Sequence, residues 1–201
     1  MNKKSVWMLR MLPVALAVVV FVGAPMAFAS DLINNGSFET GDFTGWTTGG
    51  NFEDSSVVSG PFYVYPGAED GQFYAVLGPV GSDGTLSQTF ATTVGAQYTF
   101  SFWFASVGDN PSDFSASWDG TQLLSLTNPN TGVGWTQFSF TETGTGSDTI
   151  YLGFRDDPEY MTIDNIRVVL RERQTPEPSS LLLLGTGLVG AFGAIRRRLN
   201  Q

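Results

Sequence analysis

The chain has 201 residues with 19 acidic and 10 basic side chains, a net charge of −9, and neither cysteine nor histidine. Disulfides, the Ser-His-Asp and Cys-His catalytic arrangements and the usual ligands of zinc enzymes are therefore excluded. The acidic balance also excludes nucleic acid as a partner bound through its phosphates. It is compatible with calcium binding or with solubility among polysaccharides.

The first 29 residues have the pattern of a secretory signal peptide. The basic residues near its start are Lys3, Lys4 and Arg10. An apolar stretch, 11–22, follows, and Ala27 and Ala29 then flank Phe28 as in a cleavage site. We expect cleavage between Ala29 and Ser30; the alternative is that the segment remains as an N-terminal anchor.

The region 30–172 has the pattern of an all-β domain, because several runs alternate apolar and polar residues with a period of two. The run from Tyr98 to Phe104 is one example, and Asp119-Gly120 between two such runs predicts a tight hairpin. The expected strands are 52–58, 72–77, 86–91, 98–104, 114–118, 121–126, 138–140, 150–154 and 162–170. Such short strands, separated by Gly, Asp and Asn, predict a two-sheet antiparallel sandwich.

Two short motifs mark the ends of this domain. Asn35–Gly41, with Trp46 shortly after it, opens the domain, and Ile163–Val168 closes it. Together they resemble the first and last strands of the galactose-binding-like jelly roll seen in many carbohydrate-binding modules. The resemblance implies a jelly-roll sandwich with a structural calcium ion that ties the first strand to the last, partly through backbone carbonyls near Gly36 or Ser37.

The same resemblance implies that Glu39 and Asp164 supply the carboxylates of this calcium site. In a regular strand Asp164 would share its face with Ile166 and Val168, and a carboxylate on a core face needs a metal or several hydrogen-bond donors. Calcium accepts several oxygen ligands in irregular geometry. The alternative is that Asp164 accepts backbone amides at a strand end while Glu39 is solvated.

Aromatic residues suggest a second kind of site. Trp103 and Trp135 are expected on the sheet face opposite the phenylalanines, among Ser, Thr and Gln, and Tyr63, Tyr65 and Tyr74 are expected to extend this face. A ring that stacks on a sugar, with polar neighbours for the hydroxyl groups, is typical of carbohydrate-binding surfaces. The alternative is that loops cover the tryptophans or that both are ordinary strand residues.

A pair of carboxylates is the remaining catalytic option, because glycoside hydrolysis needs two. Asp156 or Asp157 with Glu159 is such a pair, but this segment is more typical of a polar loop at a strand end. We therefore expect no enzymatic activity.

The C-terminal tail combines three elements in order. Pro176-Glu177-Pro178 holds the chain extended, because proline lacks the amide donor that regular structure needs. The uncharged run 181–195, rich in Leu and Gly, predicts a short transmembrane helix. The basic cluster that follows it is Arg196, Arg197 and Arg198. Such a cluster favours the cytoplasmic side of a membrane.

This order and spacing resemble the PEP-CTERM sorting signal of exopolysaccharide-producing Gram-negative bacteria. The resemblance implies recognition by an exosortase, a membrane transpeptidase-like protease that removes the tail near the Pro-Glu-Pro motif. With the N-terminal signal, it predicts an exported precursor in the inner membrane that then reaches the cell surface or extracellular matrix.

These features predict a signal peptide (1–29), a sandwich (30–172), a linker with the sorting motif (173–180), and a transmembrane helix with its arginine cluster (181–198). The expected function is that of a non-catalytic surface or matrix protein that binds or organises extracellular polysaccharide, for example in a biofilm. The alternative is a structural envelope or matrix protein without a defined glycan ligand, and a glycosidase is the third hypothesis.

Overall fold

The computed structural model describes residues 30–157 and 159–171, together with Gly185, Gly187, Leu188 and Arg196. Within 30–171 it describes ten strands and no helix. The strands are β1 (Thr47–Gly50), β2 (Ser56–Ser59), β3 (Phe73–Leu77), β4 (Gly84–Ala91), β5 (Gln97–Val107), β6 (Ser112–Trp118), β7 (Thr121–Thr127), β8 (Asn130–Thr143), β9 (Ser147–Asp156) and β10 (Met161–Leu170).

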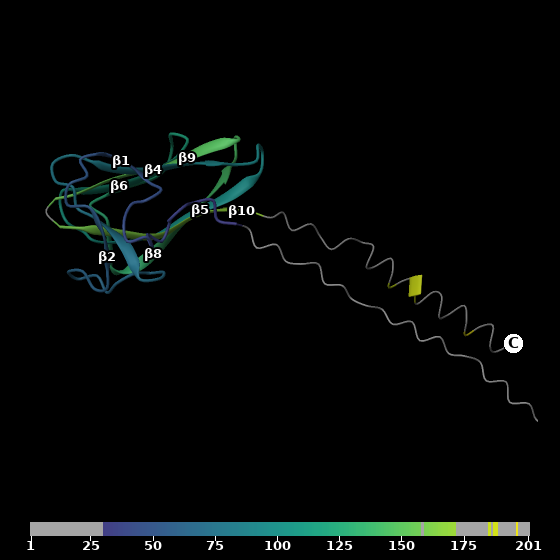
Figure 1. The fold of residues 1–201 in the computed structure, drawn as a ribbon, viewed down its shortest axis with the longest axis horizontal. Helices are drawn as coiled ribbons and strands as arrows, with labels where there is room; N and C mark the ends of the chain where they lie inside the picture. Colours follow the sequence, from purple (N-terminus) through teal and green to yellow (C-terminus); the bar gives the residue numbers. More distant parts are fainter. Residues whose placement is uncertain (1–29, 158, 172–184, 186, 189–195, 197–201) are drawn as a thin grey trace, which may run out of the picture.

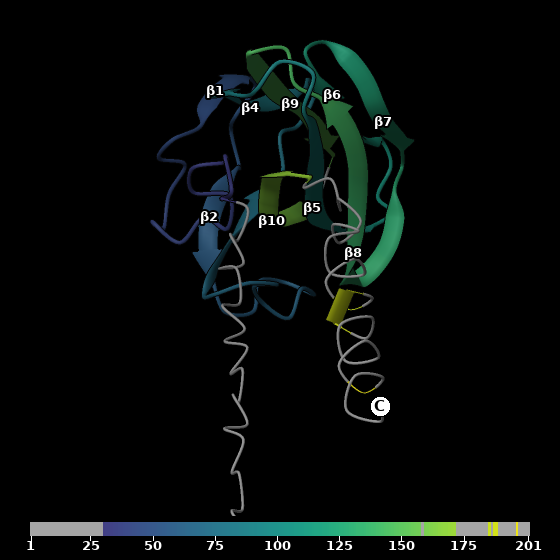
Figure 2. The same cartoon turned by 90° about the vertical axis from the view of Figure 1, so that its right-hand side faces the viewer.

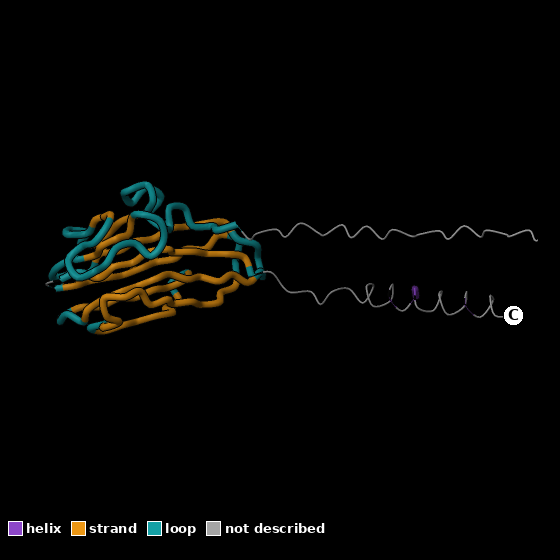
Figure 3. The backbone as a smooth tube through the Cα atoms, turned by 90° about the horizontal axis from the view of Figure 1, so that it is seen from below, coloured by secondary structure: helices purple, strands orange, loops and turns teal. Residues whose placement is uncertain are grey.

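The strands form two five-stranded sheets that pack face to face (Figure 1). One sheet has the order β1-β4-β9-β6-β7 and the other the order β2-β3-β10-β5-β8, and every described pairing is antiparallel. Figure 2 shows β7 and β8 along one edge of the sandwich, and Figure 3 shows the strands as two layers. The predicted all-β jelly-roll sandwich is therefore confirmed.

The core between the sheets is built from the alternating side chains of the long strands. Phe100, Phe102 and Phe104 of β5 are fully buried, and Phe114 of β6 packs on Phe104 with ring centroids 4.6 Å apart. Phe138 of β8 stacks on Phe102 at 5.6 Å. Each such ring contributes roughly 1.5–3 kcal/mol by leaving water, so this cysteine-free domain is stabilised mainly by its aromatic core.

The predicted hairpin at Asp119-Gly120 is confirmed. It connects β6 to β7, and both turn residues have positive φ angles, 49° and 78°. Two-residue hairpin turns that match strand twist need such angles, which Asp tolerates and Gly adopts freely.

Several strand limits differ from the prediction, most of all in β8, which runs from Asn130 to Thr143 where 138–140 was expected. The expected strand 52–58 begins only at Ser56, because Asp54 has a positive φ angle of 57° and Phe52–Ser55 form a turn region. Strand β1 was not predicted, since Thr47–Gly50 contains two glycines and no apolar residue; it forms by pairing with the edge of β4.

A β-bulge in β10 changes the faces of the residues around Asp164. The register with β5 shifts between Asp164 and Arg167, and Asn165 has a positive φ angle of 48°. Asp164 therefore lies opposite Trp103 on the outer face of the sheet, while Ile166 belongs to the core. The expectation that Asp164 and Ile166 share a face is wrong, because a bulge inserts one residue and reverses the alternation.

The expected terminal helices lie almost entirely outside the described residues. The signal segment 1–29 is not described, and of residues 172–201 only Gly185, Gly187, Leu188 and Arg196 are, all of them helical. No helix within the described part of the chain combines the length and the apolar character that a membrane span requires.

Candidate functional site

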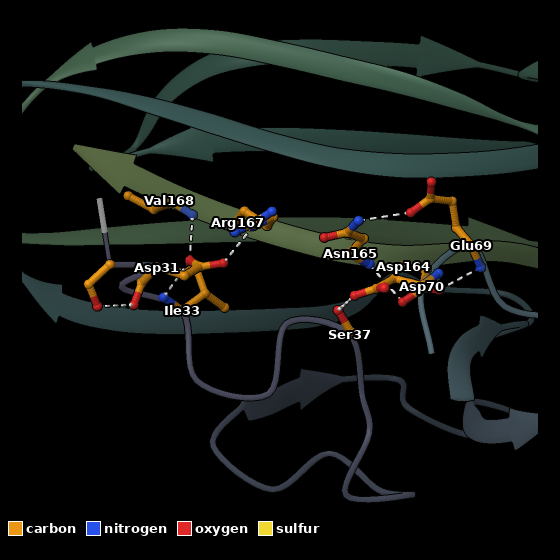
Figure 4. Close-up of polar contacts among 10 residues, drawn as sticks. Asp31, Ile33, Ser37, Glu69, Asp70, Asp164, Asn165, Arg167 and Val168 are labelled. Carbon is orange, nitrogen blue, oxygen red and sulfur yellow. Dashed lines mark hydrogen bonds and ion pairs between the residues drawn. The ribbon is translucent and has the colours of Figure 1, made fainter. Parts of the chain in front are cut away.

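The beginning of the domain runs beside β10, its last strand. The amide of Leu32 donates to the carbonyl of Val168 at 2.8 Å, and the amide of Ile166 donates to the carbonyl of Gly36 at 3.0 Å. Asp31 accepts the amide of Val168 at 3.0 Å and pairs with Nε of Arg167 at 2.9 Å (Figure 4). The two predicted end motifs are thus adjacent, although the first is a series of turns and not a strand.

Gly36 allows the closest backbone approach at this junction. A Cβ atom at this position would lie 1.9 Å from the carbonyl oxygen of Ile166. Neighbouring side chains then fix the turns: Nδ2 of Asn35 donates to the carbonyls of Asp42 and Thr44, and Nε1 of Trp46 donates to the carbonyl of Asn35 at 3.0 Å. The Asn-Gly pair and the tryptophan of the opening motif therefore have structural roles.

The carboxylate of Asp164 accepts three backbone amides. Its Oδ2 accepts those of Glu69 at 2.8 Å and Asp70 at 3.0 Å, and its Oδ1 accepts that of Asn165 at 2.7 Å (Figure 4). The side chain is fully buried, and burial raises its pKa to about 7 even though the three amides act to lower it. Asp164 thus accepts backbone amides, as the alternative expected, but at a bulge within β10 and not at a strand end, and its charge is incompletely compensated.

Glu39 lies beside the same turn. Its Oε1 accepts the amides of Gln72 and Phe73, each at 2.8 Å. The turn reaches this position because Gly71 has a positive φ angle of 72°, and a Cβ there would lie 2.3 Å from Oε1 of Glu39. Both predicted metal ligands, Glu39 and Asp164, are therefore bound by amides of residues 69–73, which brings them to one junction.

A pocket of about 340 Å³ lies at this junction. Its lining includes the oxygen-bearing side chains of Asp31, Asn35, Ser37, Glu39, Asp70 and Asn165. Ser37 donates to Oδ2 of Asp70 at 3.0 Å. Oxygen donors of this kind suit calcium, but no group of three or more Asp or Glu side chains in the described residues is arranged to hold a metal. Backbone carbonyls and water would have to supply the other ligands.

Residues 60–71, between β2 and β3, lie over the outer face of the β2-β3-β10-β5-β8 sheet. We call them the strap. Tyr74 donates from its hydroxyl to the carbonyl of Gly60 at 3.0 Å, and Nε1 of Trp135 donates to the carbonyl of Gly67 at 3.1 Å. Together with the amides that bind Asp164, these contacts attach the strap to three strands of the sheet.

The strap decides how the predicted aromatic residues are presented. Trp103 and Trp135 lie on the outer face and both are half-buried, with Trp135 packed edge-on against Tyr74 at 5.8 Å. Tyr65 is only 2% exposed and its hydroxyl donates to the carbonyl of Tyr160, so its ring faces protein. Tyr63 is 72% exposed.

One exposed aromatic residue was missed in the sequence. Tyr151 of β9 is 44% exposed on the outer face of the other sheet, opposite Ser87 of β4 and Ser117 of β6. Tyr151 occurs within an alternating run, which predicts that it points away from the core. Alternation alone does not show which of the two outer faces a ligand would use.

Two of the carboxylates considered for catalysis, Asp156 and Asp157, have different surroundings. Asp157 forms an ion pair with Arg155 at 2.6 Å, which holds the pKa of Asp157 below its usual value. Asp156 is fully buried, and its pKa is raised to about 7, first by burial and then by the charges of Asp109 and Glu159.

The processing signals lie mostly outside the described residues. This holds for the cleavage-site residues Ala27 and Ala29, and for Pro176, Glu177, Pro178, Arg197 and Arg198 of the tail, whereas Arg196 is described as helical. Comparison with known families nevertheless bears on the tail. Residues 174–198 match the family model of the PEP-CTERM protein-sorting motif.

The chain carries a PEP-CTERM sorting signal. This signal implies an exported precursor with a C-terminal membrane anchor and processing by an exosortase. No curated protein sequence is similar enough to match this chain.

Solved structures similar to the sandwich are reported for carbohydrate-binding modules. A family 61 module in complex with beta-1,4-galactotriose has a TM-score of 0.59 at 18% identity, covering 71% of this chain and 100% of that one. The tandem family 22 modules from Paenibacillus barcinonensis have a TM-score of 0.52 at 18% identity, covering 77% and 49%. The enzymatically active domain of a bacteriophage CBA120 tailspike has a TM-score of 0.53 at 18% identity, covering 70% and 21%. At this identity the likeness shows the jelly-roll fold alone.

The junction at Gly36 leads to a stability prediction. We expect Gly36→Ala to lower the free energy of unfolding by at least ~2 kcal/mol, because the added methyl group overlaps the carbonyl of Ile166. Urea unfolding followed by tryptophan fluorescence measures this. Gly134→Ala is the control, since a Cβ there meets no atom within 4 Å; equal stability of both variants would contradict the observed junction.

Proposed function

We propose that this PEP-CTERM protein is an exported, non-catalytic surface or matrix protein that binds or organises polysaccharide through its jelly roll. The observation that carries the proposal is the outer face of the β2-β3-β10-β5-β8 sheet, which carries half-buried Trp103 and Trp135, together with Tyr63 of the strap, whose ring is exposed beside Phe62 and Tyr160. Gln137 and Ser139 of β8 are exposed polar residues on the same face. Aromatic rings and polar groups are both needed to bind a sugar.

The roles of the aromatic residues differ in this proposal. Tyr63 stacks on the sugar, and the accessible edges of Trp103 and Trp135 extend the contact. Tyr65 supports this part of the strap by bonding to the carbonyl of Tyr160, the residue on whose ring Tyr63 packs. The fold likeness to carbohydrate-binding modules supports the proposal at the level of architecture.

The proposal includes a structural calcium ion at the junction of the opening segment with β10. Glu39 and Asp164 would supply carboxylates, and carbonyls near Gly36 or Ser37 the remaining ligands. The raised pKa of buried Asp164 supports this, because a nearby cation would compensate its charge. The ion's contribution is structural: it would hold the beginning of the domain on its last strand.

The polysaccharide proposal predicts a specific loss of binding. Tyr63→Ala in the secreted protein should weaken retention of the bound glycan roughly ten-fold, since truncating an aromatic anchor costs about 1–2 kcal/mol. Affinity electrophoresis and a glycan array that includes the cell's own exopolysaccharide measure this.

Tyr151→Ala is the control, because it removes an exposed tyrosine from the opposite sheet. If wild-type protein retains no glycan, the structural-protein alternative is favoured. Loss of binding in Tyr151→Ala alone would move the site to the other sheet.

The calcium proposal predicts a rise in melting temperature. At a hundredfold excess of calcium over Kd, wild-type protein should gain about 2.7 kcal/mol relative to chelator. Asp164→Asn should lose most of the response of this site, whereas Asp54→Asn, an equal charge change in an exposed turn, should keep it. Identical melting temperatures of wild type in both buffers would leave Asp164 held by amides alone.

The sorting signal predicts the mature C-terminus. The secreted form should lack everything from about Pro178 onward, because an extended Pro-Glu-Pro segment gives a protease an accessible backbone. Intact-mass spectrometry of the extracellular protein tests this, and Glu177→Ala should accumulate as unprocessed precursor. Detection of Arg196–Arg198 on wild-type protein outside the cell would refute the prediction.

A further inference from the structure

Strand β9 places an aspartate at each end of its core-facing side. The alternating residues on this side are Asp148, Ile150, Leu152, Phe154 and Asp156, and all five are 0% exposed. The three apolar members belong to the core between the sheets. The same strand thus buries two carboxylates in similar positions, and their surroundings can be compared directly.

Asp148 is fully provided with hydrogen-bond donors. It accepts the hydroxyl of Thr92, the amide of Thr145 at 3.0–3.1 Å, the hydroxyl of Thr145 at 2.9 Å and Nε1 of Trp118 at 3.3 Å. Burial alone would raise its pKa, but the hydrogen bonds with Thr92, with the side chain of Asp119 and with Thr145 outweigh burial and lower the pKa to about 2. This end of β9 therefore holds its charge without an ion.

Asp156 has no such donors. Neither carboxylate oxygen has a hydrogen-bond partner among the described residues, although its backbone amide donates to the carbonyl of Pro79 at 3.1 Å. Oδ2 of Asp109, in the connection between β5 and β6, is also buried and without a partner. Three buried carboxylate oxygens thus lack the donors that buried polar groups normally have.

The neighbouring groups do not compensate these oxygens. From the connection between β9 and β10, Glu159 and Asp157 add negative charge, and Asp157 is itself paired with Arg155. From the strap, Tyr65 lies close enough for Asp156 and Asp109 to raise its pKa, but its hydroxyl donates to the carbonyl of Tyr160. In residues 30–157 and 159–171, no arginine forms an ion pair with Asp156 or Asp109.

An uncompensated pair of this kind is costly at neutral pH, because a buried charge needs a counter-charge or donors. The available ligands are all oxygen atoms, and the chain has no histidine or cysteine to select a softer metal. Two carboxylates with carbonyl and water oxygens match the ligand preference of calcium.

We propose that Asp156 and Asp109 bind a calcium ion at the end of β9, at a site separate from the one formed by Glu39 and Asp164. The ion would connect the last residue of β9 to the β5–β6 connection. It would lie next to Tyr65 and so stabilise the part of the strap that presents Tyr63. The ion would compensate the buried charge of Asp156, as the hydrogen-bond donors compensate that of Asp148 at the other end of β9.

The experiment measures thermal unfolding of the full-length chain in detergent at pH ~8, with calcium and with chelator. Wild type should melt higher in calcium. Asp156→Asn should lose the response that this site produces, and it should melt about 3 °C or more above wild type in chelator, because it removes an uncompensated buried charge. Asp109→Asn should lose the same part of the calcium response.

Two variants serve as controls. Asp148→Asn should melt lower in both buffers and keep the full calcium response, because its carboxylate is bound by donors. Asp164→Asn should keep the calcium-dependent rise in melting temperature that Asp156→Asn loses. This result separates the two sites even if the site of Glu39 and Asp164 binds no calcium.

Two results would overturn the proposal. One is an unchanged melting temperature of wild type in calcium and chelator. The other is a full calcium response in Asp156→Asn. A shared proton is the competing explanation, and it has its own signature. Since the pKa of Asp156 is raised from its usual 3.8 to about 7, stability would then be greatest in acid and fall as pH rises through about 7, with no effect of calcium.

Discussion

The sandwich depends on one constraint: the opening segment of the domain, residues 31–36, is hydrogen-bonded to its last strand, β10. β10 lies between β3 and β5 in its sheet, and the opening segment bonds to it through Leu32 and Gly36. The same segment is tied to the opposite sheet, because Asn34 and Gln88 of β4 exchange hydrogen bonds at 2.7 and 2.9 Å. The opening segment thus links both layers at one end of the domain. In a chain without cysteine, this backbone closure takes the place that a disulfide has in other exported domains.

Two buried carboxylates, Asp164 and Asp148, and the exposed carboxylate of Glu39 organise the loops around this framework. Asp164 collects the amides at the end of the strap, and Glu39 collects those just before β3. Asp148 fixes the turn after β8 in the same way. Each of these carboxylates orders a stretch of loop by accepting backbone amides from it, and hydrogen bonds to a carboxylate are stronger than those between neutral groups. Asp156 is buried as fully as Asp148 and Asp164, but its carboxylate oxygens have no hydrogen-bond donor among the described residues.

Some aromatic residues pack in the core between the sheets, and others lie on the outer face of one sheet. The phenylalanines of β5, β6 and β8 fill the space between the sheets, where their size stabilises the fold. The tryptophans of β5 and β8 lie on the outer face, and the strap reaches across that face and accepts a hydrogen bond from Trp135. The strap leaves Tyr63 exposed and encloses Tyr65, so two tyrosines two residues apart have different environments. The aromatic surface left exposed by the strap is therefore that of Tyr63 and not that of Tyr65.

The sequence by itself determined the fold class, most strands, the Asp119-Gly120 hairpin and the sorting signal, because period-two alternation, turn residues and a short linear motif are local properties. It also named both end motifs, since Asn-Gly turns and the Ile163–Val168 run are visible locally. The tertiary structure alone decided that Asp164 lies on the outer face, because the bulge at Asn165 reverses the alternation. It also decided which tyrosine is exposed and which carboxylates receive donors. Those properties depend on contacts between residues far apart in the chain, such as Glu69 with Asp164, and no local pattern encodes them.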